Sequence, residues 1–208
     1  SVRQYSRFVS GMKLDAKERY WKWCGFAAEK EITGLTGISA DAKYLQRKEE
    51  ILKFITGGKG INDVLYSDMH QILQNDMLIK VDMMSMANSL EVRVPFLDYN
   101  LVNYVFSLPS AYKVDKHFGK KILQDAFRNK LPAGIYHRSK HGFEVPLLKW
   151  FRKELKSVIF DDLLSKEFIE DQKLFSFHEI EQIRTKLFSD NPGDCVARIW
   201  GLVVFQYW

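Results

Sequence analysis

The sequence predicts a mainly α-helical protein that forms a single unit over residues 1–208. Three observations support this fold class. Apolar residues recur at helical spacing along most of the chain, capping signals precede several of these stretches, and strict alternation of apolar and other residues is confined to residues 90–96. No linker or internal repeat divides the chain, and 46% hydrophobic residues suffice for a sizeable core.

The composition narrows the class of protein. No apolar run reaches the roughly 18 residues of a membrane span, and the first ten residues contain neither an initial Met nor an apolar signal core. The net charge of +5 comes from basic residues that acidic ones interrupt, which argues against a nucleic-acid binder. Cys24, Cys195 and the five histidines lack metal-ligand spacing. We therefore expect two buried thiols, no metal site and a reducing, cytoplasmic location.

The chain up to residue 78 is predicted to contain three helices. Asp15 and Glu18 form a capping signal for a helix over 16–32. Residues 41–55 follow helical spacing until two glycines end the helix, and the spacing resumes over 61–78. The glycine-rich sequence GGKG between these helices lacks the rest of a phosphate-binding P-loop, so we interpret it as a helix end and a turn.

Residues 81–98, VDMMSMANSLEVRVPFLD, combine three kinds of local structure. One helical face carries four apolar residues: Met83, Met86, Ala87 and Leu90. Alternation follows over 90–96, where Pro95 disfavours the helical conformation of the preceding residue. Asp98 is placed to cap the next helix, which ends before Pro109. The stretch therefore reads as a helix, an extended corner and a second helix.

Helical segments continue to the C-terminus. Four stretches have the required spacing: 119–132, 147–160, 177–188 and 195–208. Ser176 and Glu179 form a capping box for the third. The fourth is apolar nearly all round and is predicted to be buried. Residues 133–146, rich in glycine, proline and basic residues, cannot be regular helix throughout.

Two charged groups accompany the corner. Glu91 and Arg93 lie two residues apart on an extended segment, and we interpret them as a structural, partly buried ion pair, with direct ligand contact as the alternative. Asp76, Lys80 and Asp82 lie at the head of the stretch. They are either an exposed helix start or a ligand-binding wall in which Lys80 binds phosphate and Asp82 orients it.

The sequence HRSKHGF, residues 137–143, is a second candidate site. It concentrates Arg138, Lys140 and His141 on a loop flanked by glycines. Mobile basic loops often close over phosphate groups. A solvated basic turn explains the composition equally well, so both interpretations stay open.

The order of these motifs resembles that of a known family. MLIKVDMMSMANSLEVRVPFLDYNLV, GKKILQDAFRNKLP, HRSKHGFEVPL and the terminal ARIWGLVVFQYW resemble the C-terminal half of glutamine-dependent asparagine synthetases. The family pattern runs K-x-D-R-x-S-M-A-x-S-L-E-x-R-x-P-F-L-D, then K-x-x-L, L-P and R-x-K-x-G-F, and residues 77–147 meet nearly every position. Met83 departs from it, because the family commonly has a basic residue there.

The resemblance implies the helical C-terminal half of an ATP-pyrophosphatase (adenine nucleotide α-hydrolase-like) α/β synthetase domain, lacking most of the parallel sheet. Its partners would be an N-terminal glutaminase domain and the nucleotide-binding half, whose S-G-G-x-D-S motif does not occur here. In the implied reaction, an aspartate carboxylate attacks the α-phosphate of Mg²⁺-bound ATP, and glutamine-derived ammonia then displaces AMP to give asparagine. Lys140 stands where the family has a catalytic lysine; Lys80, Asp82 and Arg138 are candidates for binding substrate or ATP.

We expect the whole enzyme to use aspartate, glutamine, ATP and Mg²⁺, and this chain alone to be inactive and to bind no cofactor tightly. Other interpretations remain: a catalytically inert helical binding module, or a related amidotransferase that acts on a different carboxylate. A homo-oligomer is also an option, because an apolar surface left uncovered favours self-association.

Overall fold

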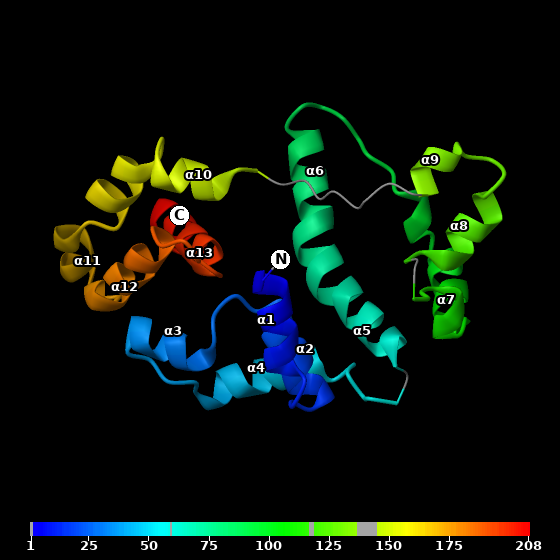
Figure 1. Cartoon of the computed structure of the whole chain (residues 1–208), viewed down its shortest axis with the longest axis horizontal. Helices are drawn as coiled ribbons and strands as arrows, with labels where there is room; N and C mark the ends of the chain where they lie inside the picture. The colour runs from blue at the N-terminus through cyan, green and yellow to red at the C-terminus, as the bar shows by residue number, and fades with distance from the viewer. Residues whose placement is uncertain (1, 59, 117–118, 137–144) are drawn as a thin grey trace. The chain divides into compact units, whose positions relative to one another are not determined.

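The computed structural model describes residues 2–58, 60–116, 119–136 and 145–208 (Figure 1). Within these ranges every regular element is a helix, and the one β-type contact is an isolated bridge. The prediction of a mainly α-helical fold is therefore confirmed. No helix in the same ranges is both long and apolar enough to cross a membrane.

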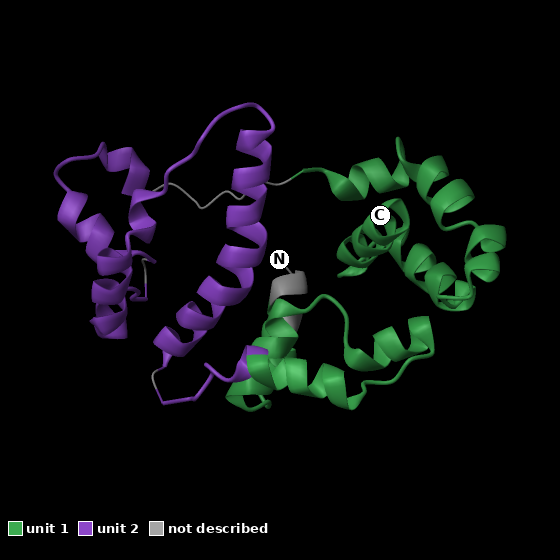
Figure 2. Cartoon of the chain, turned by 180° about the vertical axis from the view of Figure 1, so that it is seen from behind, with its two compact units in different colours: residues 1–50, 143–208 green, residues 51–142 purple. Residues whose placement is uncertain are grey.

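The chain divides into two compact units, which Figure 2 shows in different colours. Unit 1 comprises residues 1–50 and 143–208, and unit 2 comprises residues 51–142. Unit 1 is thus built from two segments that are distant in sequence, whereas unit 2 is continuous. The expectation of one helical domain over residues 1–208 stays a prediction, because compact units of this size can belong to one domain.

Unit 1 combines N-terminal and C-terminal helices. Its elements are α1 (Val2–Gly11), α2 (Ala16–Cys24), α3 (Glu29–Thr36), most of α4 (Ala42–Leu52), α10 (Leu147–Arg152), the π-helical η4 (Val158–Leu163), α11 (Lys166–Gln172), α12 (Phe177–Leu187) and α13 (Cys195–Tyr207). Two predicted caps are confirmed. The Asp15 carboxylate accepts a hydrogen bond from the Glu18 N–H at 3.0 Å, and the Ser176 hydroxyl accepts one from the Glu179 N–H at 3.4 Å.

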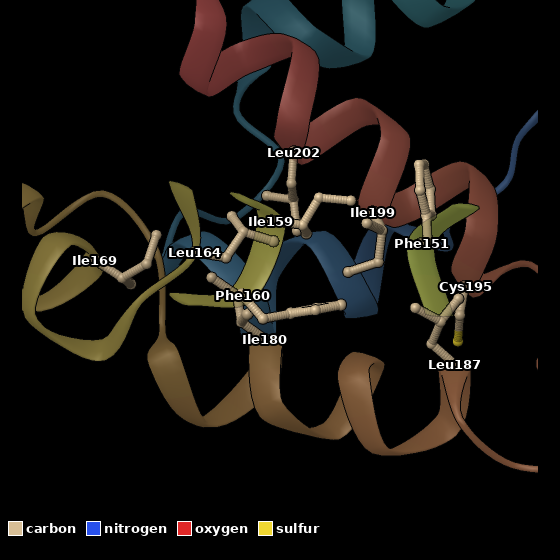
Figure 3. Close-up of a cluster of buried hydrophobic side chains, with 10 residues drawn as sticks. All are labelled: Phe151, Ile159, Phe160, Leu164, Ile169, Ile180, Leu187, Cys195, Ile199 and Leu202. Carbon is tan, nitrogen blue, oxygen red and sulfur yellow. The ribbon is translucent and has the colours of Figure 1, made fainter. Parts of the chain in front are cut away.

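The core of unit 1 lies where its C-terminal elements meet (Figure 3). Phe151 of α10, Ile180 of α12 and Ile199 of α13 are 0% exposed. The cluster also contains side chains from η4, α11, α12 and α13: Ile159, Phe160, Leu164, Ile169, Leu187, Cys195 and Leu202. Helices α12 and α13 contact each other directly, and the apolar face of each contributes to this core.

A half-buried lysine links the N-terminal helices of unit 1. Lys48 of α4 has a side chain that is 11% exposed, and its Nζ lies 2.9 Å from Glu18 Oε1 and 3.0 Å from Glu29 Oε1. The Tyr44 hydroxyl donates to the same Glu29 oxygen at 3.0 Å. The hydrogen bond from Lys48 is the main reason that the pKa of Glu29 is lowered. Ion pairs therefore connect helices α2, α3 and α4.

Unit 2 begins with a long helical rod. Its elements are α5 (Ile61–Asp68), the π-helical η1 (Met69–Leu78), α6 (Ile79–Met86), the 3-10 turn η2 (Pro95–Leu97), α7 (Tyr99–Ser107), η3 (Ser110–Tyr112), α8 (Lys121–Phe127) and α9 (Ala133–Tyr136). The first three follow one another without a break (Figure 1). A small aromatic cluster of Phe54, Tyr66, His70 and Phe106 packs α5 and η1 against α7.

Three expectations about unit 1 need correction. The predicted helix 16–32 is interrupted at Gly25, whose extended backbone (φ −78°, ψ 155°) separates α2 from α3. Cys24 is exposed and only Cys195 is buried. Helix α13 buries one face alone: Ile199 is fully covered, whereas Trp200 is 47% exposed. Apolar composition predicted the helix correctly, but burial depends on what packs against each face.

Candidate functional site

Lys80 lies on α6, a helix in which no residue is buried. Its Nζ is 3.8 Å from Asp76 Oδ1, one turn earlier, and contacts Met77 Sδ at 3.7 Å. The Lys80 side chain is 54% exposed and that of Asp76 is 61% exposed. An ion pair this long and exposed contributes little stability and leaves the ammonium donors available. The geometry is therefore compatible with phosphate binding by Lys80.

Asp82 does not face Lys80. The two residues are separated by two positions on a helix, and side chains at that spacing point in different directions. The Asp82 carbonyl accepts a hydrogen bond from the Ser85 hydroxyl at 3.1 Å, but no described residue forms a hydrogen bond or ion pair with the Asp82 carboxylate. The structure thus places Asp76, and not Asp82, beside Lys80. A role for Asp82 in binding ligand stays a prediction, but the expectation that Asp82 orients Lys80 is not supported.

Helix α6 ends before the predicted corner, but residues 95 and 96 of that corner, which were expected to be extended, belong to the 3-10 turn η2. Ser89 adopts a left-handed conformation (φ 57°) that ends the helix, and the Leu90 N–H donates to Ser85 O at 2.9 Å. Asp98 is the N-cap of helix α7, and its carboxylate accepts hydrogen bonds from the Asn100 and Leu101 N–H groups at 3.0 and 3.1 Å. The predicted cap of α7 is confirmed. These local signals therefore position the whole stretch between α6 and α7.

Glu91 and Arg93 form the expected ion pair, but they are not partly buried. Their side chains are 68% and 85% exposed, respectively. The surrounding apolar residues are exposed as well: Met83, Met86, Leu90, Val92, Val94 and Phe96. Burial of the pair was inferred from alternation, which identifies two faces of a segment without showing that either is covered.

We expect removal of this pair to change stability only slightly. In this chain at micromolar concentration, Glu91→Ala and Arg93→Ala should each lower the free energy of unfolding by less than about 1 kcal/mol, because exposed ion pairs contribute about 0–1 kcal/mol. Urea unfolding followed by circular dichroism measures the change. A loss of about 3–5 kcal/mol in either variant would instead indicate a buried, uncompensated charge.

The basic loop lies mostly outside the described residues. Arg138, Lys140 and His141 fall in 137–144, so their predicted roles stay predictions. The ends of this segment are described: α9 reaches Tyr136, and α10 begins after Pro146.

One buried cation in unit 2 was missed by sequence reasoning. Lys113 is 7% exposed, its Nζ donates to Asn62 Oδ1 at 2.6 Å, and it lies 5.0 Å from the ring centre of Phe106. Burial lowers its pKa. Nothing in the local sequence distinguishes Lys113 from an exposed lysine, because its burial comes from elements up to 51 residues away. The hydrogen bond from Lys113 to Asn62 links α5 to the segment after α7. Lys113 is distant from Lys80 in the sequence.

Unit 1 contains a groove that includes none of the predicted site residues. Its volume is about 540 Å³, and helices α3, α12 and α13 line it with Phe205, Cys195, Lys186 and Arg198 among others. Burial raises the pKa of the Cys195 thiol, which therefore stays protonated at neutral pH. The groove has no activated nucleophile among these residues.

Comparison with known proteins identifies the family. The profile of the family described as "Asparagine synthase" matches residues 5–208, nearly the whole chain. Asparagine synthetase [glutamine-hydrolyzing] 1 of Bacillus subtilis is 29% identical over 151 residues, which are 71% of this chain and 23% of that protein. Asparagine synthetase [glutamine-hydrolyzing] 3 of the same organism is 39% identical over 106 residues, 50% of this chain and 17% of that protein.

A chicken relative, asparagine synthetase [glutamine-hydrolyzing] of Gallus gallus, is 36% identical over 69 residues, 32% of this chain and 12% of that protein. The matched regions therefore span about a quarter or less of these relatives. The comparison with solved structures finds no significant match. The family match covers both units and includes the motif between α6 and α7, and the chain belongs to the asparagine synthase family.

Proposed function

We propose that this chain is the helical C-terminal part of an ATP-dependent amidotransferase that converts aspartate to asparagine. The observation that carries the proposal is the family match over 5–208, which includes the motif with Lys80, Glu91 and Arg93. The exposed position of Lys80 supports it, because a ligand can approach this ammonium from solvent. The relatives are named as glutamine-hydrolyzing enzymes. By analogy, glutamine would supply the ammonia here, and its hydrolysis would take place in a separate domain.

The proposed reaction has two steps. The side-chain carboxylate of aspartate attacks the α-phosphorus of ATP, pyrophosphate leaves, and an aspartyl-adenylate forms. Ammonia then attacks the activated carbonyl, AMP leaves and the amide remains. Lys140 would hold a fixed positive charge next to the phosphate oxygens as negative charge shifts during the first step. Lys80 and Arg138 would bind ligand phosphate or carboxylate groups, and Asp82 would contact the substrate.

Mg²⁺ is not assigned to this chain. Among the described residues, no group of three or more acidic, histidine or cysteine side chains is arranged to hold a metal ion. The acids nearest Lys80 in sequence, Asp76 and Asp82, belong to different faces of the helical rod. We therefore derive no step through the metal from these residues.

A related amidotransferase with a different carboxylate substrate is the second candidate. Met83 favours it, because this position commonly carries a basic residue in the family. The Met83 side chain is 59% exposed, so it can contact a ligand. Loss of one cation removes an attractive partner for a second negative charge on the substrate.

The two candidates differ in which acid supports AMP formation by the whole protein. With glutamine and Mg-ATP present, we expect aspartate to stimulate the release of AMP and pyrophosphate and to yield asparagine. Other amino acids and small carboxylic acids, tested at equal concentration, serve as controls. Stimulation by another acid but not by aspartate would support the second candidate; no stimulation by any acid would contradict both.

We expect this chain by itself to bind ATP weakly. It lacks the phosphate loop of the family, so Lys80 and the basic loop would contact the nucleotide without the other half of its site. Isothermal titration of this chain with Mg-ATP should show no binding in the micromolar range. A dissociation constant near 1 μM, about −8 kcal/mol, would show that these residues form a complete nucleotide site.

A further inference from the structure

The segment between α6 and η2 has the features of an unpaired β-strand. It runs from Leu90 to Val94 without helix, and Figure 1 shows it leaving the end of α6 toward η2 and α7. Val94 has φ −117° and ψ 90°, near the extended region. Among the described residues, none forms a backbone hydrogen bond with the N–H or carbonyl groups of Glu91, Val92 or Arg93. Such an edge is available to pair with another strand.

The pattern of apolar and charged residues in this segment is symmetric about Val92, and the residues on either side of Val92 carry opposite charges. Leu90, Val92 and Val94 alternate with Glu91 and Arg93, which separates an apolar face from a charged face. In an antiparallel pair centred on Val92, each residue before the centre lies opposite the equivalent residue after it. Glu91 of one copy then lies opposite Arg93 of the other, and the reverse pair forms at the same time. Opposite charges directly across an antiparallel pair stabilise it.

The existing hydrogen bonds select one register of this type. The Leu90 N–H already donates to Ser85 O at 2.9 Å, and residue 95 is a proline that lacks an N–H. The backbone groups of Glu91 and Arg93 are free of described partners, and residues two apart direct these groups to the same edge. Glu91 and Arg93 of two copies can therefore exchange four backbone hydrogen bonds. Val92 then faces its own symmetry mate in a pair without backbone hydrogen bonds.

We propose that residues 90–94 form a homotypic interface in which two copies of this chain pair as antiparallel strands across a twofold axis through Val92. The exposed Glu91–Arg93 ion pair within each copy is exchanged for two ion pairs between copies, so no charge is left without a partner. The apolar side chains at 90, 92 and 94, which are 60%, 43% and 41% exposed, come together on the other face. This inference does not depend on the reaction proposed above.

The interaction is expected to be weak. A pair of short strands is marginal in water, so the dissociation constant should be on the order of 100 μM. Sedimentation velocity of the full chain from about 10 μM to 1 mM should show a reversible monomer–dimer equilibrium. Wild-type chain that stays monomeric over this range, combined with failure of the crosslink described below, would overturn the proposal.

Charge exchange tests the opposed pairs. Arg93→Glu and Glu91→Arg each place like charges across the axis and should raise the dissociation constant about tenfold. The double variant restores opposite charges, as does an equimolar mixture of the two single variants, and both should recover the wild-type dimer. Lys166→Glu is the matched control, because it makes the same charge change at an exposed ion pair of α11. Equal effects of Arg93→Glu and the control, or no recovery in the double variant, would contradict the proposed register.

A crosslink tests the axis itself. In a Cys24→Ser background, Val92→Cys should form a disulfide-linked dimer under mild oxidation, because opposed Cα atoms in such a pair are about 4.5 Å apart. Val94→Cys is the control: its two copies would be about 13 Å apart along the strands and should not crosslink. Faster crosslinking at 94 than at 92 would show that the strands pair in another register or with another surface.

Discussion

In the whole enzyme proposed above, replacing Lys140 with alanine is expected to lower the rate of amide synthesis by about 10²–10³, or roughly 3–4 kcal/mol in the barrier. An ordinary lysine, with a pKa near 10.4, is protonated at neutral pH. Its charge would stabilise the phosphate oxygens more in the transition state than in the ground state. ATP–pyrophosphate exchange in the presence of aspartate should fall by the same factor, because it reports formation of the adenylate.

Glutamine hydrolysis supplies the internal comparison for this variant. It takes place at a separate site in the proposed enzyme and should persist when Lys140 is replaced. Lys140→Arg should recover little activity, since the planar guanidinium does not reproduce a compact ammonium. Lys149→Ala changes an exposed lysine of α10 and should leave both activities near wild type. Full synthesis in Lys140→Ala, or equal loss of both activities, would mean that the catalytic charge lies elsewhere.

Phe151→Ala is expected to have the largest effect on stability. Phe151 is 0% exposed, lies in the apolar cluster of unit 1 and stacks near Trp200 with ring centres 6.5 Å apart. Removing a buried phenyl ring leaves a cavity and typically costs about 3–5 kcal/mol. Urea unfolding monitored by tryptophan fluorescence should show the transition at a much lower denaturant concentration.

The matched control is Phe168→Ala. Phe168 lies on α11 of the same unit but is 41% exposed, so its truncation should cost less than about 1 kcal/mol. Similar losses in the two variants would show that α10 does not pack in the core as described. Retention of the helical circular-dichroism spectrum in Phe151→Ala at low temperature would show that the variant loses stability without losing its fold.

Local signals predicted local structure well. Asp15, Asp98 and Ser176 cap helices as expected, because each interaction is made with an N–H group two or three residues away. The mainly α fold and the corner after α6 follow from spacing of the same short range. The break at Gly25 was missed, since a single glycine inside a helical pattern is tolerated at many other sites.

Burial and pairing were less predictable because they depend on distant segments. Glu91 and Arg93 form an ion pair, as their opposite charges and close spacing allow. Their exposure could not be predicted, because it depends on whether another segment packs over them. Lys113 illustrates the reverse case: it looks like a surface lysine, yet Asn62 and Phe106 enclose it. The candidate site was located through the order of motifs, and its chemistry still depends on residues 137–144.

The π-helical segment Met69–Leu78 has a consequence for how chain length can vary in this family. A π turn contains more residues than an α turn, because each hydrogen bond spans five residues and not four. Loss of one residue between α5 and α6 could be absorbed if part of η1 tightened to α-helix. The same loss within α6 would rotate everything beyond it by about 100°, since an α turn takes 3.6 residues. When sequences of relatives are aligned, single-residue deletions should therefore occur mainly in η1, which precedes Lys80, and rarely in α6, which carries Lys80.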